Sequence, residues 1–280
     1  MIPAPFDYEV AESAEHAITL LGEREDAKLI AGGHSLLPAM KLRLARPSVL
    51  VDIGRIAGLS YIRDGGEHIA IGALTRHHDV HADPLLQDHC PIIAFAAGTI
   101  GDPQVRHRGT IGGTLAHGDP ASDMPAVMLA LDAELVLRGQ GGERTVPAAD
   151  FFMGVFQTAI ASDEMLVEVR VPKRASVGWS YQKMRRRAQD WATVAVAAIV
   201  ERTNGSVGKA SIGLVNMGAT PLRARAAEEA LVGGTAIDDA AALIPEGTDP
   251  SSDQAASADF RKHLAQVLGR RALEEAVARR

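Results

Sequence analysis

The chain has 280 residues, of which 46% are hydrophobic and 23% are charged, so it can bury a full core and lacks the composition of a disordered protein. A net charge of −6 and an aromatic content of 4% argue against nucleic-acid binding as its main task. The single cysteine, Cys90, excludes an internal disulfide, a cysteinyl zinc site and an iron–sulfur cluster held by this chain alone.

The sequence contains no membrane or secretion signal. No apolar run approaches the roughly 20 residues that a membrane span needs. The first residues lack the basic start and the apolar stretch of a secretory signal. We therefore expect a soluble, cytoplasmic protein.

Residues 1–57 predict a small α/β lobe. Ser13 is a suitable cap for a helix that continues through Leu21, and short apolar strands are predicted over residues 27–31 and 48–53. This order of strands and helix is typical of an α/β unit.

Residues 58–175 predict a second lobe, which opens with a hairpin over residues 60–72 around a Gly65-Gly66 turn. The other regular elements predicted here are a helix after Thr75, a helix from Leu85 to Ala97, a helix from about Pro125 to Leu131 and a hairpin over residues 133–146. Between the helices lies a polar, glycine-rich connector, residues 101–123. It is too long for a passive connection, so we expect a binding loop.

The pattern changes after Pro172, and we place a domain boundary between Val171 and Trp179. A C-terminal domain, 176–280, then follows a larger first domain, 1–175. Its predicted elements are antiparallel strands over 179–187, 192–201 and 207–218, a helix capped by Thr220 with Pro221 in its first turn and Gly233-Gly234 after its end, and an amphipathic helix from Asp259 to Arg280. The stretch 235–258 is expected as a long loop.

Two glycine motifs are candidates for phosphate binding. The first is Ala-Gly-Gly-His-Ser at residues 31–35, and the second is Thr-Ile-Gly-Gly-Thr at residues 110–114. Paired glycines allow a ligand to approach the backbone and expose successive amides to an anion. Each pair alone is better explained as a tight turn, but two such loops with adjacent hydroxyls favour a dinucleotide diphosphate. The patterns of Rossmann and P-loop proteins are both missing.

The segments 31–56 and 109–137, which contain these motifs, resemble the FAD-binding medium subunits of molybdenum hydroxylases, and most closely the carbon monoxide dehydrogenase type. Xanthine dehydrogenase belongs to the same family. The resemblance extends over most of the chain and includes residues 164–172 and 218–224. It implies an α+β fold: an FAD-binding domain of the p-cresol methylhydroxylase type, built from two α/β lobes, and a C-terminal antiparallel sheet with helices.

The resemblance also implies a function. Such a subunit passes electrons from two-iron two-sulfur clusters through a noncovalently bound FAD to an external acceptor. A partner large subunit carries the molybdopterin and a partner small subunit carries the clusters, in a dimer of heterotrimers. This chain would then need no catalytic residue and no metal ligand of its own.

Eighteen positions are implied as contacts of the FAD. They are Leu29, Ile30, Ala31, Gly32, Gly33, His34, Ser35, Leu36, Ile100, Thr110, Ile111, Gly112, Gly113, Thr114, Asp123, Leu166, Lys183 and Trp191. Asp123 is expected beside the sugar-derived part of the cofactor, because a carboxylate accepts hydrogen bonds from hydroxyls.

Three of these positions either allow a second interpretation or differ from the residue that is usual in the family. Lys183 can be aligned in two registers and is equally consistent with a solvated strand lysine. Trp191 stands where relatives carry Tyr beside the flavin ring, and is equally consistent with a core aromatic. Thr114 replaces the Asp or Asn of many relatives, which alters one polar contact.

Other features are given structural interpretations. His77, His78 and His81 are read as a solvated helix start rather than a metal site, and Cys90 as a buried or tolerated thiol. The basic segments 104–108 and 183–187 are either solvated faces or docking surfaces for a partner.

Two other functions stay open. One is a self-contained flavin oxidase of the p-cresol methylhydroxylase type, and the other is a non-enzymatic scaffold that has lost FAD. The sequence also leaves open the substrate of the complete enzyme, whether carbon monoxide, a purine, nicotine or another heterocycle, and the electron acceptor.

Overall fold

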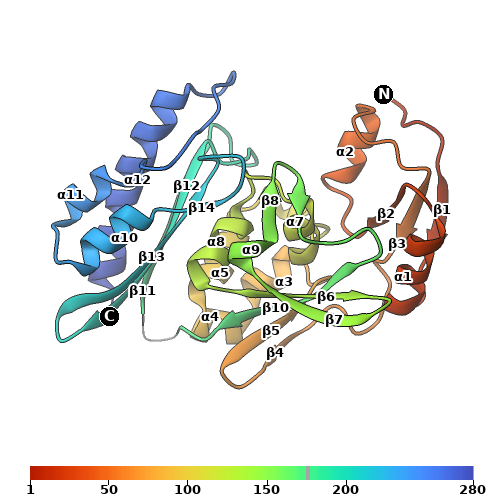
Figure 1. Cartoon of the computed structure of the whole chain (residues 1–280), viewed down its shortest axis with the longest axis horizontal. Helices are drawn as coiled ribbons and strands as arrows, with labels where there is room; N and C mark the ends of the chain where they lie inside the picture. The colour runs from red at the N-terminus through yellow and green to blue at the C-terminus, as the bar shows by residue number, and fades with distance from the viewer. Residues whose placement is uncertain (175–176, 280) are drawn as a thin grey trace.

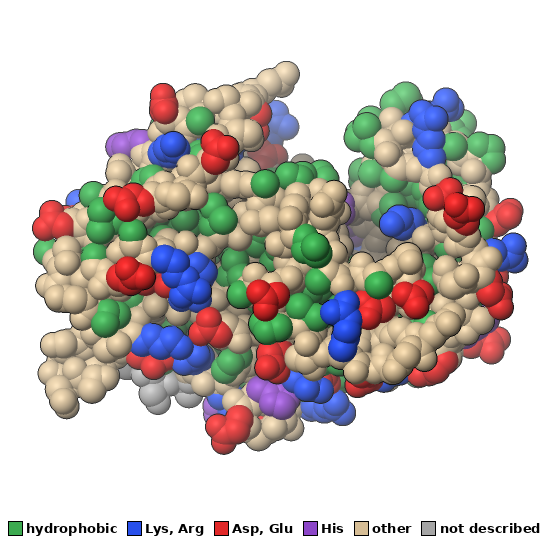
Figure 2. Space-filling model, in the orientation of Figure 1, with side chains coloured by type: hydrophobic (Ala, Val, Ile, Leu, Met, Phe, Trp, Pro, Cys, Tyr) green, Lys and Arg blue, Asp and Glu red, His purple; other side chains and the backbone are tan. Residues whose placement is uncertain are grey.

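A computed structural model describes residues 1–174 and 177–279 and contains an N-terminal unit, a central unit and a C-terminal unit (Figure 1). Figure 2 shows the surface hollowed between the N-terminal unit and the rest of the molecule. The expected mixed fold of helices and sheets is confirmed. The proposed junction of the two domains, at residues 175 and 176, lies outside the described residues.

The N-terminal unit is a parallel sheet in the order β1-β3-β2 with one helix packed against it. Its elements are β1 (Asp7–Val10), α1 (Ala14–Glu23), β2 (Ala27–Ile30), α2 (Leu36–Lys41) and β3 (Val49–Asp52). Ser13 caps α1 as predicted, because its hydroxyl accepts from the His16 amide at 3.1 Å. The buried face of α1 shares a core with β3 and with one face of the central sheet.

The central unit is an antiparallel sheet in the order β4-β5-β10-β6-β7, covered by helices. Its strands are β4 (Ile62–Asp64), β5 (His68–Gly72), β6 (Glu134–Gly139), β7 (Gly142–Pro147), β8 (Phe152–Gly154), β9 (Gln157–Thr158) and β10 (Met165–Pro172). Its helices are α3 (His77–Ala82), α4 (Pro84–His89), α5 (Pro91–Gly98), α6 (Pro103–Arg106), α7 (Ile111–His117), α8 (Asp123–Leu131) and α9 (Ala148–Phe151). Both predicted hairpins form.

Two predictions for this unit are wrong. The helix expected from Leu85 to Ala97 is divided into α4 and α5 at Cys90, because Pro91 has no amide to donate and begins a new helix. The connector 101–123 is not an irregular loop, since it contains α6 and α7.

Strand β10 joins the cores of the first two units. Met165 and Val167 point into the core shared with α1, whereas Leu166 and Val169 belong to the core under the helices. The strand is buried on both faces, and a register shift between Leu166 and Glu168 interrupts the strict alternation, so that Val169 lies in the same core as Leu166.

The C-terminal unit is an antiparallel sheet in the order β11-β12-β13-β14 with helices on one face. Its elements are β11 (Gly178–Met184), β12 (Val194–Thr203), β13 (Ser206–Val215), β14 (Leu222–Arg223), α10 (Arg225–Val232), α11 (Ile237–Ala242) and α12 (Ala258–Ala278). The three predicted strands form, and the short β14 adds a fourth. Arg280, the predicted end of the last helix, lies outside the described residues.

Two further corrections concern this unit. Thr220 does not cap a helix: Leu222 and Arg223 pair with β13, so α10 begins only at Arg225. The expected loop 235–258 contains α11.

The C-terminal sheet lies directly against the central unit. Alternate residues of β12 face opposite cores: Val196 packs with α12, and Ala197 packs with the core that includes α5 and α8. At Gly213 of β13, an added Cβ would lie only 2.1 Å from the carbonyl oxygen of Ala126 in α8. Glycine is therefore required where the backbones of the two units meet.

Candidate functional site

The first glycine loop, residues 31–35, connects β2 to α2. The chain turns there through Gly33, whose φ of +74° lies in the left-handed region that favours glycine. His34 is exposed, whereas Gly32 and Ser35 are half-buried. The loop therefore presents backbone at Gly32 and Gly33, and its exposed side chain is that of His34.

The second glycine loop, residues 110–114, begins α7 beside the central sheet. Thr110 caps this helix, since its hydroxyl accepts from the Gly113 amide at 3.1 Å. The Gly112 amide donates to the carbonyl of Ala73, just past β5, at 2.9 Å. A Cβ at Gly112 would lie 2.6 Å from that same oxygen, so the close approach requires glycine.

The two loops face each other. A Cβ added to Gly32 would lie 2.3 Å from the carbonyl oxygen of Arg108 and 2.8 Å from the Cα of Gly109. These residues immediately precede the second loop, so residues 31–35 and 110–114 form the two sides of one cradle. Segments nearly eighty positions apart in the sequence thus meet as the glycine motifs predict.

The two loops differ in which amides are free. In the second loop, the amides of Ile111 to Thr114 all donate within the protein, to Thr75, Ala73 and Thr110. In the first loop, the amides of Gly32 to Ser35 donate to no group in the described part of the chain. The expectation that both loops offer an equivalent set of amides to an anion is therefore wrong: the first loop offers amides, and the second offers glycine surface and side chains.

Two arginines lie beside the second loop. The Arg76 guanidinium donates to the carbonyl of Arg108, and Arg76 also pairs with Thr110 in an isolated antiparallel bridge. Their positive charges and the unused amides of the first loop together favour an anionic ligand in the cradle.

His77 lies behind the second loop and is not part of a solvated helix start as predicted. It is buried, and its backbone amide donates to Gly109 at 3.1 Å. Its Nε2 lies 2.9 Å from Oγ1 of Thr114. Burial, with a smaller contribution from Arg106, lowers the pKa of His77 to about 4, so the ring is neutral at pH 7.

Asp123 and Lys183 form a buried ion pair between the central and C-terminal units. Asp123 begins α8 and Lys183 lies on β11, with 2.8 Å between Oδ2 and Nζ, and both side chains are at most 5% exposed. The Tyr181 hydroxyl donates to the other carboxylate oxygen, and burial together with Asp123 raises the pKa of Tyr181 well above its ordinary value. Lys183 is thus not a solvated strand lysine.

The remaining candidates are dispersed around the cradle. Leu29, Ile30 and Leu36 are half-buried beside the first loop, and Ile100 is half-buried after α5. Leu166 is buried in the core that also contains Ile111. Trp191 is 53% exposed between β11 and β12, so it is not a core aromatic.

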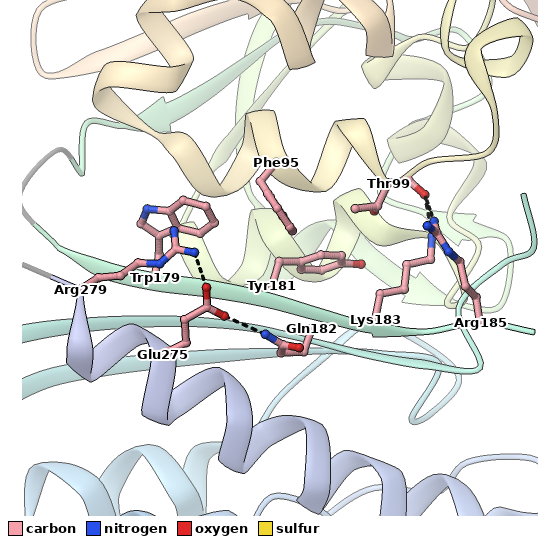
Figure 3. A pocket seen from close by; sticks show the side chains of 9 residues that line it. All are labelled: Phe95, Thr99, Trp179, Tyr181, Gln182, Lys183, Arg185, Glu275 and Arg279. Atoms are coloured by element: carbon pink, nitrogen blue, oxygen red, sulfur yellow. Dashed lines mark hydrogen bonds and ion pairs between the residues drawn. The ribbon is translucent and has the colours of Figure 1, made fainter. Parts of the chain in front are cut away.

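A cavity of about 360 Å³ lies between α5 and the C-terminal unit (Figure 3). Phe95 and Thr99 come from α5 and its end. The other wall is formed by residues of β11 and α12 and those just after them: Trp179, Tyr181, Gln182, Lys183, Arg185, Glu275 and Arg279. Its polar groups pair mainly with each other: Glu275 accepts from Gln182 and Arg279, and the carbonyl of Thr99 accepts from Lys183 and Arg185. The cavity therefore adjoins the Asp123–Lys183 pair but is separate from the glycine loops in its lining.

The basic segments differ from each other. Arg106 donates to the carbonyls of Ile100 and Gly101 and so stabilises its own loop. Arg186 and Arg187 are exposed and form no ion pair within the described residues. A docking role therefore fits the second segment better than the first.

Neither a metal site nor a membrane helix is found. Across residues 1–174 and 177–279, no group of three or more His, Cys, Asp or Glu side chains is placed to bind a metal ion. Over the same residues, no helix is both long enough and apolar enough to cross a membrane.

Sequence reasoning missed His77, Tyr181 and Arg76 as parts of this region. A signal existed for His77: it lies three residues before Val80, which faces the core from the same side of α3. The neighbours of Tyr181 and Arg76 belong to distant segments, so no local pattern identifies them.

Comparisons with known proteins agree on one family. A model described as the FAD binding domain in molybdopterin dehydrogenase matches residues 4–174, and one described as the CO dehydrogenase flavoprotein C-terminal domain matches residues 179–276. The carbon monoxide dehydrogenase medium chain of Hydrogenophaga pseudoflava is 43% identical, over 100% of this chain and 99% of that one.

A further relative and a solved structure agree with this family. The 6-hydroxypseudooxynicotine dehydrogenase complex subunit alpha of Paenarthrobacter nicotinovorans is 40% identical, over 100% of this chain and 97% of that one. A solved structure of Hydrogenophaga pseudoflava carbon monoxide dehydrogenase, which lacks the Mo-pyranopterin moiety of its molybdenum cofactor, superposes with a TM-score of 0.97 at 45% identity and covers 99% of each chain.

Proposed function

The chain belongs to the family of FAD-binding medium subunits of molybdenum hydroxylases, and from this membership we propose that it holds FAD between its glycine loops and transfers electrons within a heteromeric enzyme. The observation that carries the proposal is the cradle itself. The amides of residues 32–35 donate to no group among the described residues, and only glycine at position 32 allows their loop to approach the second loop so closely.

The donor set fits a dinucleotide diphosphate. Four successive amides of the first loop and the cations of Arg76 and Arg108 suit its negative charges. Half-buried Leu29, Ile30 and Leu36 provide apolar surface beside the phosphates, and exposed Trp191 is free to cover a flavin face. Ile100, Asp123, Leu166 and Lys183 complete the proposed site.

Flavin chemistry supplies the redox step, since FAD can accept electrons one at a time and release them in pairs. The residues of this chain bind and orient it, and none of them needs to act as an acid, base or nucleophile on the substrate of the complete enzyme. We propose that a molybdopterin-binding large subunit performs that step and that an iron–sulfur small subunit delivers the electrons, in a dimer of heterotrimers. A single buried cysteine fits a reducing compartment, the cytoplasm.

The substrate of the complex is not encoded in this chain. A relative named for carbon monoxide is 43% identical and one named for 6-hydroxypseudooxynicotine is 40% identical, so medium subunits of nearly equal similarity serve different substrates.

The test begins with the purified chain. We expect the absorption bands of a flavin and release of the FAD into the supernatant when the protein is precipitated with acid. Flavin retained on the precipitate would indicate a covalent link and favour a self-contained oxidase. A chain that neither copurifies with FAD nor binds added FAD would instead be a scaffold.

Activity is the second arm of the test. The isolated chain should oxidise neither carbon monoxide nor a heterocycle, although its flavin should be reduced by dithionite and reoxidised by an artificial acceptor. Hydroxylase activity should appear when the two partner subunits are coexpressed. Substrate turnover by the isolated chain would overturn the proposed function.

A further inference from the structure

The second glycine loop has little left to offer an anion from its backbone. The amides of Ile111 to Thr114 already donate within the protein, and the carboxyl-terminal side of the loop continues into α7. Any further hydrogen bond from this side of the cradle must come from a side chain. Thr114 is the half-buried hydroxyl in the right place, next to exposed Gly113.

The hydroxyl of Thr114 is already in contact with His77. The ring nitrogen Nε2 lies 2.9 Å from Oγ1, and the imidazole is 1% exposed. The other ring nitrogen, Nδ1, is buried and has no hydrogen-bond partner within the described residues. The ring is also fixed from the loop side, since a Cβ on Gly109 would lie 3.0 Å from its Cδ2.

These contacts determine which nitrogen carries the proton. With the proton on Nδ1, a buried N–H would lack an acceptor, and Nε2 would accept the hydrogen bond of the Thr114 hydroxyl. With the proton on Nε2, the buried N–H is satisfied by Oγ1, and only an acceptor lone pair at Nδ1 is left unused. Leaving a buried donor unpaired is the rarer and costlier arrangement, so the Nε2–H tautomer is assigned.

We propose that His77 is a positioning residue for the cofactor: its Nε2–H donates to Thr114 Oγ1 and thereby commits the Thr114 O–H to donate to the FAD diphosphate. The proposal rests on the proposed function, and adds a residue that does not itself touch the FAD. Because Oγ1 already accepts from the fixed Nε2–H, the hydroxyl proton of Thr114 is free to point toward the cradle.

The experiment measures the affinity of the full chain, stripped of flavin, for FAD by fluorescence quenching and for ADP by competition. Thr114→Val should weaken both ligands by roughly tenfold or more, the range of a hydrogen bond to a charged group, whereas Thr114→Ser should stay within about twofold. His77→Leu should weaken FAD by a similar factor, and the double variant should bind no worse than Thr114→Val alone. His77→Gln, which keeps a donor near the position of Nε2, should restore most of the affinity.

The control is His78→Leu. His78 adjoins His77 in sequence, but its ring stacks on that of His107, with 4.0 Å between the ring centroids. The affinity of this variant for FAD should equal that of the wild type. Equal affinities of wild type and Thr114→Val, or independent effects of His77→Leu and Thr114→Val, would overturn the inference and leave the proposed function intact. Absence of FAD binding in the wild type would overturn the proposed function itself.

A second measurement covers the case in which His77→Leu does not fold. Long-range ¹H–¹⁵N correlation spectra of the wild-type chain report the tautomer of each neutral histidine. We expect a protonated Nε2 and a bare Nδ1 at His77, and the opposite tautomer would overturn the inference.

Discussion

Gly32 shows how a single hydrogen atom in place of a side chain allows two distant loops to meet. A methyl group there would lie 2.3 Å from the Arg108 carbonyl oxygen, well inside contact distance. Gly32→Ala should therefore push the loops apart and weaken FAD binding by roughly ten- to a hundredfold, the equivalent of an overpacking cost of about 1–3 kcal/mol. Titration of the flavin-free chain with FAD measures the effect.

The matched control for Gly32 is Gly141→Ala in the turn between β6 and β7, where an added Cβ meets nothing within 4 Å. This variant should bind FAD like the wild type. If Gly32→Ala also bound FAD like the wild type, the two loops would be turns rather than a binding site.

His77 predicts how stability responds to acid. The pKa of His77 is about 4 in the folded chain, below its ordinary value of 6.5. Between pH 6.5 and pH 4, the imidazole is therefore protonated in the unfolded chain but neutral in the folded chain. Stability should fall as the pH decreases from about 6.5 to about 4, by about 3 kcal/mol in total. Urea denaturation at a series of pH values measures this slope.

The variant His77→Gln should flatten that slope, and His78→Gln should leave it unchanged. His117, whose pKa is also lowered by burial, contributes in the same direction and limits how flat the profile becomes. An unchanged slope in His77→Gln would show that the imidazole is not buried in its neutral form.

At the scale of helices and strands, local pattern predicted what local interactions determine. Ser13 caps α1, and the alternation along β12 places Val196 and Ala197 in opposite cores, because both follow from neighbouring residues. Two local signals were misread: Pro91 begins α5 inside what periodicity alone suggests is one helix, and Thr220 with Pro221 precedes a short strand rather than a helix. The amides at the start of α7 donate to Ala73 and Thr75, in the segment between β5 and α3, and the sequence does not display these long-range contacts.

In the candidate site, too, local sequence predicted some features, and long-range contacts determine the others. The glycine motifs predicted the two loops, but which amides stay free depends on Ala73 and Thr75, residues that meet the second loop only in the folded chain. The partners of Lys183 likewise come from α8 and the end of α5, 60 and 84 positions away. Long-range pairing of this kind has no local signature.

The Asp123–Lys183 pair joins α8 to β11 and should contribute strongly to stability. Lys183→Met would leave the Asp123 carboxylate buried without its cation, which costs about 3–5 kcal/mol. Urea denaturation should show this loss, and the double variant Asp123→Asn with Lys183→Met should recover much of it. Arg24→Ala, which removes a largely exposed pair with Glu9, should cost no more than about 1 kcal/mol. Equal losses in Lys183→Met and Arg24→Ala would contradict the burial of the pair.

At the scale of the whole molecule, assembly with partners should depend on the exposed basic segment after β11. Arg186 forms no ion pair among the residues described, so reversing its charge should leave the fold intact. Arg186→Glu should weaken binding to the partner subunits by about tenfold, with the loss shrinking as salt rises, because screened contacts matter less. Copurification at two ionic strengths measures this.

The control for assembly is Arg271→Glu, an exposed arginine on α12. It should assemble like the wild type. Arg106 is unsuitable for this experiment, since it holds the carbonyls of Ile100 and Gly101 and its reversal would disturb the loop itself. Undiminished assembly of Arg186→Glu would exclude this segment as a docking surface.

Cys90, at the junction of α4 and α5, can serve as a probe of transient opening of the core. Cys90 is the chain's one thiol, it is buried in the core that also holds Ile111 and Leu115 of α7, and burial raises its pKa to about 12. A thiol reagent can therefore modify the protein only when this core opens, and the rate of modification counts those openings. FAD bound at the glycine loops should stabilise this core, so the rate of thiol modification should fall as the bound fraction of FAD rises. The modification rate of Cys90 would then measure FAD binding without an added label.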